Sequence, residues 1–139
     1  MQRLILPFLS GLLAVLFFQQ AAIGLLHAAN MGVRIAYDTA AAPPLGVPGF
    51  IQEAVIGGVW GVLMAWALRI PSRLTAPWLG ATLFGAIALT AFSIFVIGPL
   101  NGVWPSGNIL PRVSSGLVSN AAWGWGALVF MRAFLRDVE

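Results

Sequence analysis

Residues 4–29 read LILPFLSGLLAVLFFQQAAIGLLHAA, and this run contains no Lys, Arg, Asp or Glu. A transmembrane helix needs about 20 mostly apolar residues, so the run is long enough to cross a bilayer. It is also longer than the apolar core of a signal peptide, which has about 7–15 residues. We therefore expect a retained membrane helix rather than a cleaved leader.

Three further apolar stretches follow, and the breaks between them are rich in Pro and Gly, which end helices. The four predicted spans cover about residues 4–29, 50–68, 77–97 and 113–134. They predict an all-α membrane protein, a four-transmembrane-helix bundle built from two helical hairpins. All 139 residues would then form a single integral membrane domain.

The composition agrees with this fold class and excludes several others. Hydrophobic residues make up 60% of the chain and charged residues only 8%, whereas about a quarter of an average soluble domain is charged. A soluble domain, a disordered tail and a nucleic-acid partner are therefore not expected. The chain has no cysteine, which excludes a disulfide framework and a thiol nucleophile.

The arginines predict the orientation in the membrane, because positive residues gather on the cytoplasmic side. With four spans, one side holds Arg3, Arg69, Arg73, Arg132 and Arg136, whereas the other holds Arg34 and Arg112. Both termini are therefore predicted to be cytoplasmic, with the loops at about residues 30–49 and 98–112 outside. The lack of Lys and the abundance of Ala, Gly and Arg favour a bacterial inner membrane.

The two halves of the sequence resemble each other weakly. Trp60-Gly61 recurs as Trp123-Gly124, 63 residues later, and the same shift takes Pro48 to Pro111 and Arg69 to Arg132. Two spans in each half would give a parallel 2+2 repeat. Trp, Gly and Pro are frequent in this chain, so chance remains the alternative interpretation.

Small residues spaced four apart let membrane helices approach closely. Gly57 and Gly61 have this spacing in the second span, and Ala122 and Gly126 have it in the fourth. One interpretation is packing within the bundle. The other is a helix-docking face for another subunit or a second copy of the chain.

Polar side chains inside a membrane are costly and therefore mark candidate functional positions. Gln19 and Gln20 are neighbours in the first span and would point about 100° apart on a helix. We expect them to form interhelical hydrogen bonds with different neighbours. The alternative is that one of these amides binds a substrate. Trp60 and Trp123 lie deep in their spans, where each indole N–H needs a partner or a ligand.

A polar cluster is predicted near the outer ends of the first two spans, and its members are the candidate ligand-binding residues His27, Arg34, Asp38, Glu53 and Arg112. It would either fix the long loop to the bundle or form a vestibule. His27 is the only histidine and the candidate metal ligand, for the metal of a haem or a (bacterio)chlorophyll. The small residues Gly24 and Ala28 would leave room for such a macrocycle.

Catalytic signatures are missing from the sequence, which contains no HExxH, GxSxG or Walker A motif. The predicted function is a non-catalytic accessory or structural subunit that packs against a larger membrane complex and binds lipid or pigment. The alternative is a small transporter or channel-like protein that works as a homo-oligomer with an outer polar vestibule. The expected partners are the lipid bilayer and other membrane subunits or another copy of the chain.

Overall fold

The computed structural model describes residues 2–31, 35–42, 46–68 and 77–135. The elements, in which η denotes a π-helical segment, are α1 (Gln2–Ala14), η1 (Val15–Gln19), α2 (Gln20–Ala28), β1 (Ala41–Ala42), β2 (Val47–Pro48), α3 (Gly49–Ala67), α4 (Pro77–Phe84), η2 (Gly85–Leu89), α5 (Thr90–Phe92), η3 (Ser93–Ile97), α6 (Gly98–Leu100) and α7 (Leu110–Leu135). The predicted all-helical character is confirmed for these ranges, apart from the short pair β1–β2.

Two of the long helices contain π-helical segments. In the first helix, the backbone N–H of Gln20 bonds to the carbonyl of Val15, five residues back. Each such π-bulge inserts an extra residue and changes the direction of the side chains that follow. In the third helix, η2 and η3 interrupt the run from α4 to α6.

Within the described residues, three helices are long and apolar enough to cross a membrane: Arg3–Ala28, Gly49–Ala67 and Trp78–Leu100. The fourth long helix, α7, has 26 residues but is not in this set. Its apolar character is diluted by polar residues, of which Ser119 and Asn120 are buried inside the molecule. Length and composition thus identify three candidate spans, one fewer than the sequence predicts.

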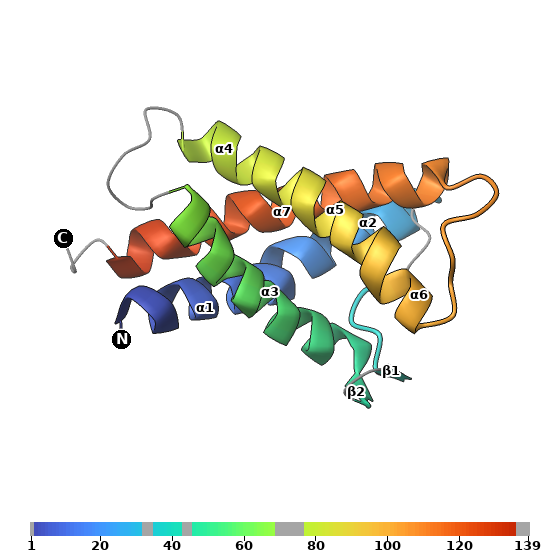
Figure 1. The fold of residues 1–139 in the computed structure, drawn as a ribbon, viewed down its shortest axis with the longest axis horizontal. Coiled ribbons are helices and arrows are strands. Elements are labelled where there is room, and N and C mark those ends of the chain that lie inside the picture. The colour runs from blue at the N-terminus through green and yellow to red at the C-terminus, as the bar shows by residue number, and fades with distance from the viewer. Residues whose placement is uncertain (1, 32–34, 43–45, 69–76, 136–139) are drawn as a thin grey trace.

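The long helices form two crossed pairs (Figure 1). In the first pair α1 packs against α3, and in the second α4 and η2 pack against α7. The pairs are joined by the contact between α1 and α7. The start of α1 and the end of α7 lie at one end of the bundle, here called the terminal end (Figure 1). The β1–β2 pair and the segment before α7 lie at the other, the loop end.

The two pairs cross at equivalent glycines. A Cβ atom on Gly61 would collide with the carbonyl oxygen of Pro7, and one on Gly124 would collide with that of Ala81. Gly61 and Gly124 belong to the Trp-Gly repeat that is offset by 63 residues. Backbones can approach this closely only where the side chain is absent. The shared contact supports an internal repeat.

The first helix of each hairpin also ends in the same way. Asn30 adopts a positive φ of 58° and Gly102 one of 78°. In each case the next residue bonds back across the turn, from Met31 N to the Leu26 carbonyl at 2.9 Å and from Val103 N to the Gly98 carbonyl at 2.7 Å. This is the Schellman arrangement, in which a left-handed residue ends a helix.

The glycines considered as a docking face are used within the chain. Gly57 and Gly61 are buried against α1. A Cβ atom on Gly126 would overlap the ring of Phe18, and Ala122 is half-buried. The structure therefore favours bundle packing, the first of the two interpretations, for these three glycines.

Candidate functional site

A cavity of about 570 Å³ lies between the two hairpins. Its walls come from η1, α2 and α3 of the first hairpin and from η2 to α7 of the second. Some lining residues lie at the loop end, including Gly49, Asn101 and Arg112, while others reach the middle of the bundle, including Trp60 and Asn120. The volume lies within the range of about 300–1,000 Å³ that is usual for small-molecule sites.

The cavity lies between the two hairpins, at positions related by the 63-residue offset. Gln52 and Ile56 of α3 line it, as do Ser115 and Ser119, the α7 residues at the 63-residue offset. Equivalent positions of the two hairpins thus face a common space. In membrane proteins with internal repeats, substrate sites typically lie at the interface between the repeats.

The π-helical segments all contribute to the cavity wall. Gln19 comes from η1, Leu89 from η2, and Ser93, Ile94 and Ile97 from η3. Such bulges cost regular helical hydrogen bonding and are frequent at functional sites. Their common position favours a functional role for this space.

A buried chain of hydrogen bonds connects the hairpins beside the cavity. The Nε2 atom of Gln19 donates to Oδ1 of Asn120 at 2.7 Å, and Nδ2 of Asn120 donates to Oγ1 of Thr90 at 3.0 Å. All three side chains are buried. The bonds satisfy polar groups that would otherwise be unpaired in an apolar interior.

Gln20 faces a different neighbour from Gln19, which confirms the expectation of separate interhelical partners. Its Nε2 atom donates to Oε2 of Glu53 at 2.8 Å, and its Oε1 atom accepts from the backbone N–H of Tyr37 at 2.8 Å. Gln20 is buried and Glu53 is half-buried on the cavity wall. The Glu53 carboxylate is therefore held by a hydrogen-bond donor of its own hairpin.

Tyr37 fixes the loop to the π-helical segment. Its hydroxyl donates to the carbonyl of Leu16 at 2.5 Å, the group that Gln20 N–H would engage in a regular α-helix. Its ring also packs edge-on against Phe50, with centroids 5.8 Å apart. Tyr37 is the only tyrosine in the chain, but no sequence pattern indicates this role.

Arg112 is the cation on the cavity wall. The side chain is half-buried, and its Nη1 atom donates to the Trp104 carbonyl in a long bond of 3.4 Å. A Cβ atom on Gly98 would come within 2.8 Å of Nη2, so the guanidinium lies against the start of α6.

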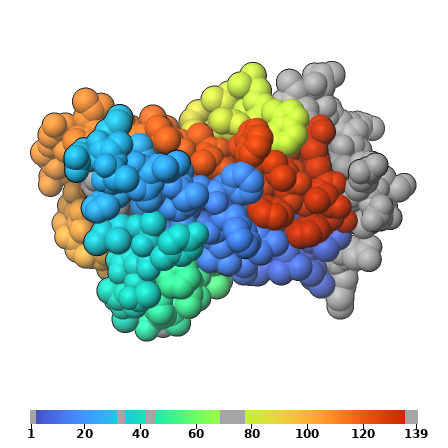
Figure 2. All heavy atoms as spheres, turned by 180° about the vertical axis from the view of Figure 1, so that it is seen from behind, coloured from blue at the N-terminus to red at the C-terminus, as the bar shows by residue number. Residues whose placement is uncertain are grey.

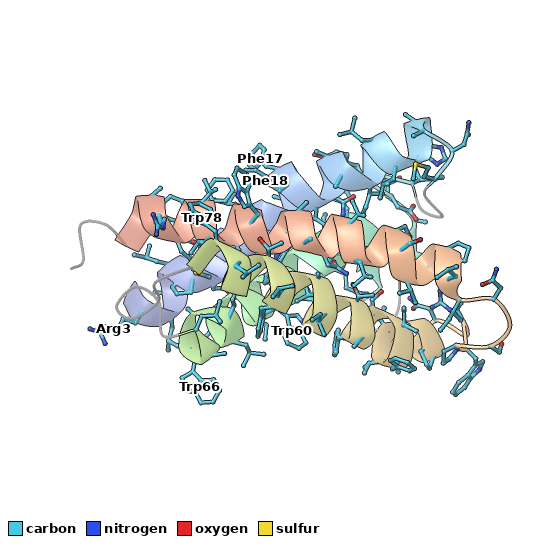
Figure 3. All side chains as sticks on the ribbon, turned by 90° about the horizontal axis from the view of Figure 1, so that it is seen from above. Arg3, Phe17, Phe18, Trp60, Trp66 and Trp78 are labelled. Atoms are coloured by element: carbon cyan, nitrogen blue, oxygen red, sulfur yellow. The ribbon has the colours of Figure 1, made fainter. Side chains whose placement is uncertain are left out.

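Aromatic rings line the deeper apolar part of the cavity. Trp60 and Phe92 both line it, and their ring centroids are 5.4 Å apart. Trp60 also packs edge-on against Phe84 at 5.9 Å, which joins α3 to the third helix. The Trp60 side chain is labelled in Figure 3. Trp123, which lies 63 residues after Trp60, is fully buried and donates its indole N–H to the Gly11 carbonyl at 3.0 Å.

The predicted outer cluster is brought together only in part. Glu53 and Arg112 both line the cavity, but His27 and Asp38 are exposed and do not. Asp38 instead accepts a hydrogen bond from the backbone of Ala40 in its own loop. Arg34 lies outside the described residues. The loop before α3 and the loop before α7 gather at the same end of the molecule (Figure 2).

A metal site is not found in the described part of the chain, where no three His, Cys, Asp or Glu side chains are grouped to hold an ion. A magnesium or haem iron that takes His27 as a single axial ligand remains a prediction. The exposed position of His27 on α2 places such a pigment outside the cavity.

Comparison with known proteins adds no assignment, since no protein-family model, curated protein or solved structure matches this chain. The class of protein is therefore described from its fold and its cavity alone. The chain is a helical protein with three apolar helices long enough for a membrane and a cavity between its two hairpins.

Proposed function

We propose that this protein binds a small amphipathic molecule inside the membrane, in the cavity between its hairpins. The observation that carries the proposal is the cavity itself, about 570 Å³ in volume, with polar and apolar lining. Gln52, Glu53 and Arg112 offer polar contacts, whereas Trp60 and Phe92 offer apolar ones. Sites for small molecules commonly combine an apolar wall with a few polar groups that fix orientation.

The proposed placement in the membrane follows from the ends of the bundle. We infer that α7 is a fourth span, since its 26 residues extend about 39 Å at 1.5 Å per residue. Arg3 and Arg132 lie toward the terminal end and Arg112 toward the loop end. With the terminal end in the bacterial cytoplasm, the cavity lies toward the outer side.

Transport of the bound molecule is a second candidate function, with the chain acting alone or as a homo-oligomer. The position of the cavity between the two hairpins favours it, because many transporters bind substrate between two related halves of the chain. Movement of one hairpin against the other would have to break the bond between Gln19 and Asn120.

The accessory-subunit function stays a prediction. Small-residue faces for docking are one of its supports, beside the lack of catalytic signatures, and Gly57, Gly61 and Gly126 are occupied by contacts within the chain. The cavity therefore supports ligand binding better than the glycines support docking.

The test compares molecules that remain bound after gentle extraction of three proteins: wild type, Ser115→Phe and Ser114→Phe. Ser115 is half-buried and lines the cavity, whereas Ser114 is exposed and does not. Native mass spectrometry should show a bound amphiphile on wild type and Ser114→Phe, and its loss from Ser115→Phe. Equal occupancy in both variants, with both folded by circular dichroism, would contradict binding in the cavity.

A further inference from the structure

The two charged side chains described on the cavity wall differ in their partners, and this difference indicates the charge of the ligand. Among the described residues that line the cavity, Arg112 and Glu53 carry a charge. Glu53 accepts a hydrogen bond from Gln20 within its own hairpin. Across the residues that the structure describes, Arg112 has only the 3.4 Å bond to the Trp104 carbonyl and no carboxylate partner.

A guanidinium carries five N–H donors in a fork that matches a carboxylate or a phosphate. Such a charge is costly to bury in an apolar setting unless an anion pairs with it. Arg112 is half-buried beside Gly98, so it is removed from water in part. Within the part of the chain that the structure describes, no carboxylate pairs with it, so its remaining N–H donors can bind an anion supplied by a ligand.

The remaining wall indicates what is attached to this anion. Ile94 and Ile97 of η3 line the same cavity as Arg112, and Trp60 and Phe92 line it nearer the middle of the bundle. Arg112 is the third residue of α7, at the loop end. A molecule with its head at Arg112 would thus extend an apolar chain inward, away from the loops.

We propose that Arg112 binds the anionic head of a single-chain amphiphile, a carboxylate or a phosphate, whose chain fills the apolar part of the cavity. This inference rests on the proposed function and names its ligand class. A volume of about 570 Å³ is in the range for a drug-sized molecule, which suits one chain and a small head.

The experiment measures binding of four probes to the purified full chain in a non-ionic detergent. The probes are palmitate, hexadecanol, hexadecyltrimethylammonium and inorganic phosphate, which differ in head charge or lack the chain. Wild type should bind palmitate about tenfold more tightly than hexadecanol, because charged hydrogen bonds are the strong ones. It should bind the ammonium probe least.

Variants then test whether Arg112 causes the difference in affinity between palmitate and hexadecanol. Arg112→Gln should abolish the preference for palmitate while leaving hexadecanol binding unchanged, and Arg112→Lys should retain part of it. Arg132→Gln is the matched control, since Arg132 is exposed at the other end and stacks over Trp78 at 5.0 Å. It should bind both probes as wild type does.

Three outcomes would overturn the inference. In the first, wild type binds palmitate and hexadecanol equally and Ser115→Phe binds neither. The cavity would then be a binding site, but without a preference for an anionic head group. In the second, Arg112→Gln still prefers palmitate to hexadecanol, which would show that another residue binds the head group. Competition by inorganic phosphate as strong as that by palmitate would assign the site to a free anion. Failure of every chain-bearing probe to bind would instead contradict the proposed function itself.

Discussion

The carboxamides of Gln19 and Asn120 are joined by a hydrogen bond of 2.7 Å, although the residues lie 101 positions apart in the chain. Gln19 belongs to the π-helical segment of the first helix and Asn120 to the middle of α7. Both border the cavity. This bond therefore ties the two hairpins together at the wall of the proposed site.

Replacing Asn120 with leucine should destabilise the bundle, since it removes bonds to both Gln19 and Thr90. We expect a loss of about 1–2 kcal/mol, because single interhelical hydrogen bonds in membranes average about 0.6 kcal/mol. Unfolding by sodium dodecyl sulfate in mixed micelles, followed by circular dichroism, measures it. Thr82→Ala is the control, since the Thr82 hydroxyl bonds only to its own helix. Equal stability of the two variants would show that the bridge contributes nothing.

Replacing either Gly61 or Gly124 with alanine should lower the free energy of unfolding by a similar amount. The new Cβ atom would collide with the Pro7 carbonyl in Gly61→Ala and with the Ala81 carbonyl in Gly124→Ala. Backbone atoms cannot rotate away, so we expect each variant to lose about 1–3 kcal/mol. Gly24→Ala is the control, since its nearest contact would be an ordinary 3.4 Å to the Ala36 side chain. If Gly61→Ala lowered the free energy of unfolding and Gly124→Ala did not, the two helix crossings would not be equivalent.

The sequence predicts the helices and the glutamine partners but not every helix end. The helices follow from runs such as residues 4–29, and separate partners for Gln19 and Gln20 follow from the 100° step between neighbours. The start of α7 at Leu110, ahead of the predicted residue 113, was missed. Pro111 lies in the first turn of α7, where proline is tolerated because its missing N–H would have no partner there.

The cavity itself could not be predicted from residue patterns. It depends on π-bulges in the first and third helices, which have no reliable sequence signature. The predicted cluster grouped His27 with Glu53 because their spans were expected to end at a similar depth. Depth alone does not fix the direction of a side chain, and His27 faces outward. Asn120 is the only amide side chain within residues 113–134, and that rarity is a sequence signal for its role.

Loss of the indole N–H at Trp123 should weaken the contact between α7 and α1. Trp123→Phe keeps a large ring but removes the 3.0 Å bond to the Gly11 carbonyl. We expect the free energy of unfolding to fall by about 1–3 kcal/mol, including the cost of a smaller ring in a buried site. Trp66→Phe is the comparison, since Trp66 is 79% exposed. Similar losses for the two variants would contradict a specific role for the buried indole.

Removing the hydroxyl of Tyr37 should loosen the first loop without unfolding the bundle. Tyr37→Phe loses the bond to the Leu16 carbonyl but keeps the ring contact with Phe50. We expect faster proteolysis within residues 35–42 and a change in global stability below about 1 kcal/mol, the usual net value of one hydrogen bond. Phe50→Leu tests the ring contact separately. Unchanged cleavage rates in Tyr37→Phe would show that this bond does not hold the loop.

The most direct test of the cavity as a binding site is to map where a bound amphiphile touches the chain. A fatty acid with a photoreactive diazirine near the end of its chain is added to the protein in vesicles, irradiated, and located by peptide mass spectrometry. We predict labelling of cavity residues such as Trp60, Phe92 and Ile56, suppressed by excess palmitate and by Ser115→Phe. Labelling confined to outward-facing residues such as Leu63, Leu83 and Ile87, insensitive to both, would contradict it.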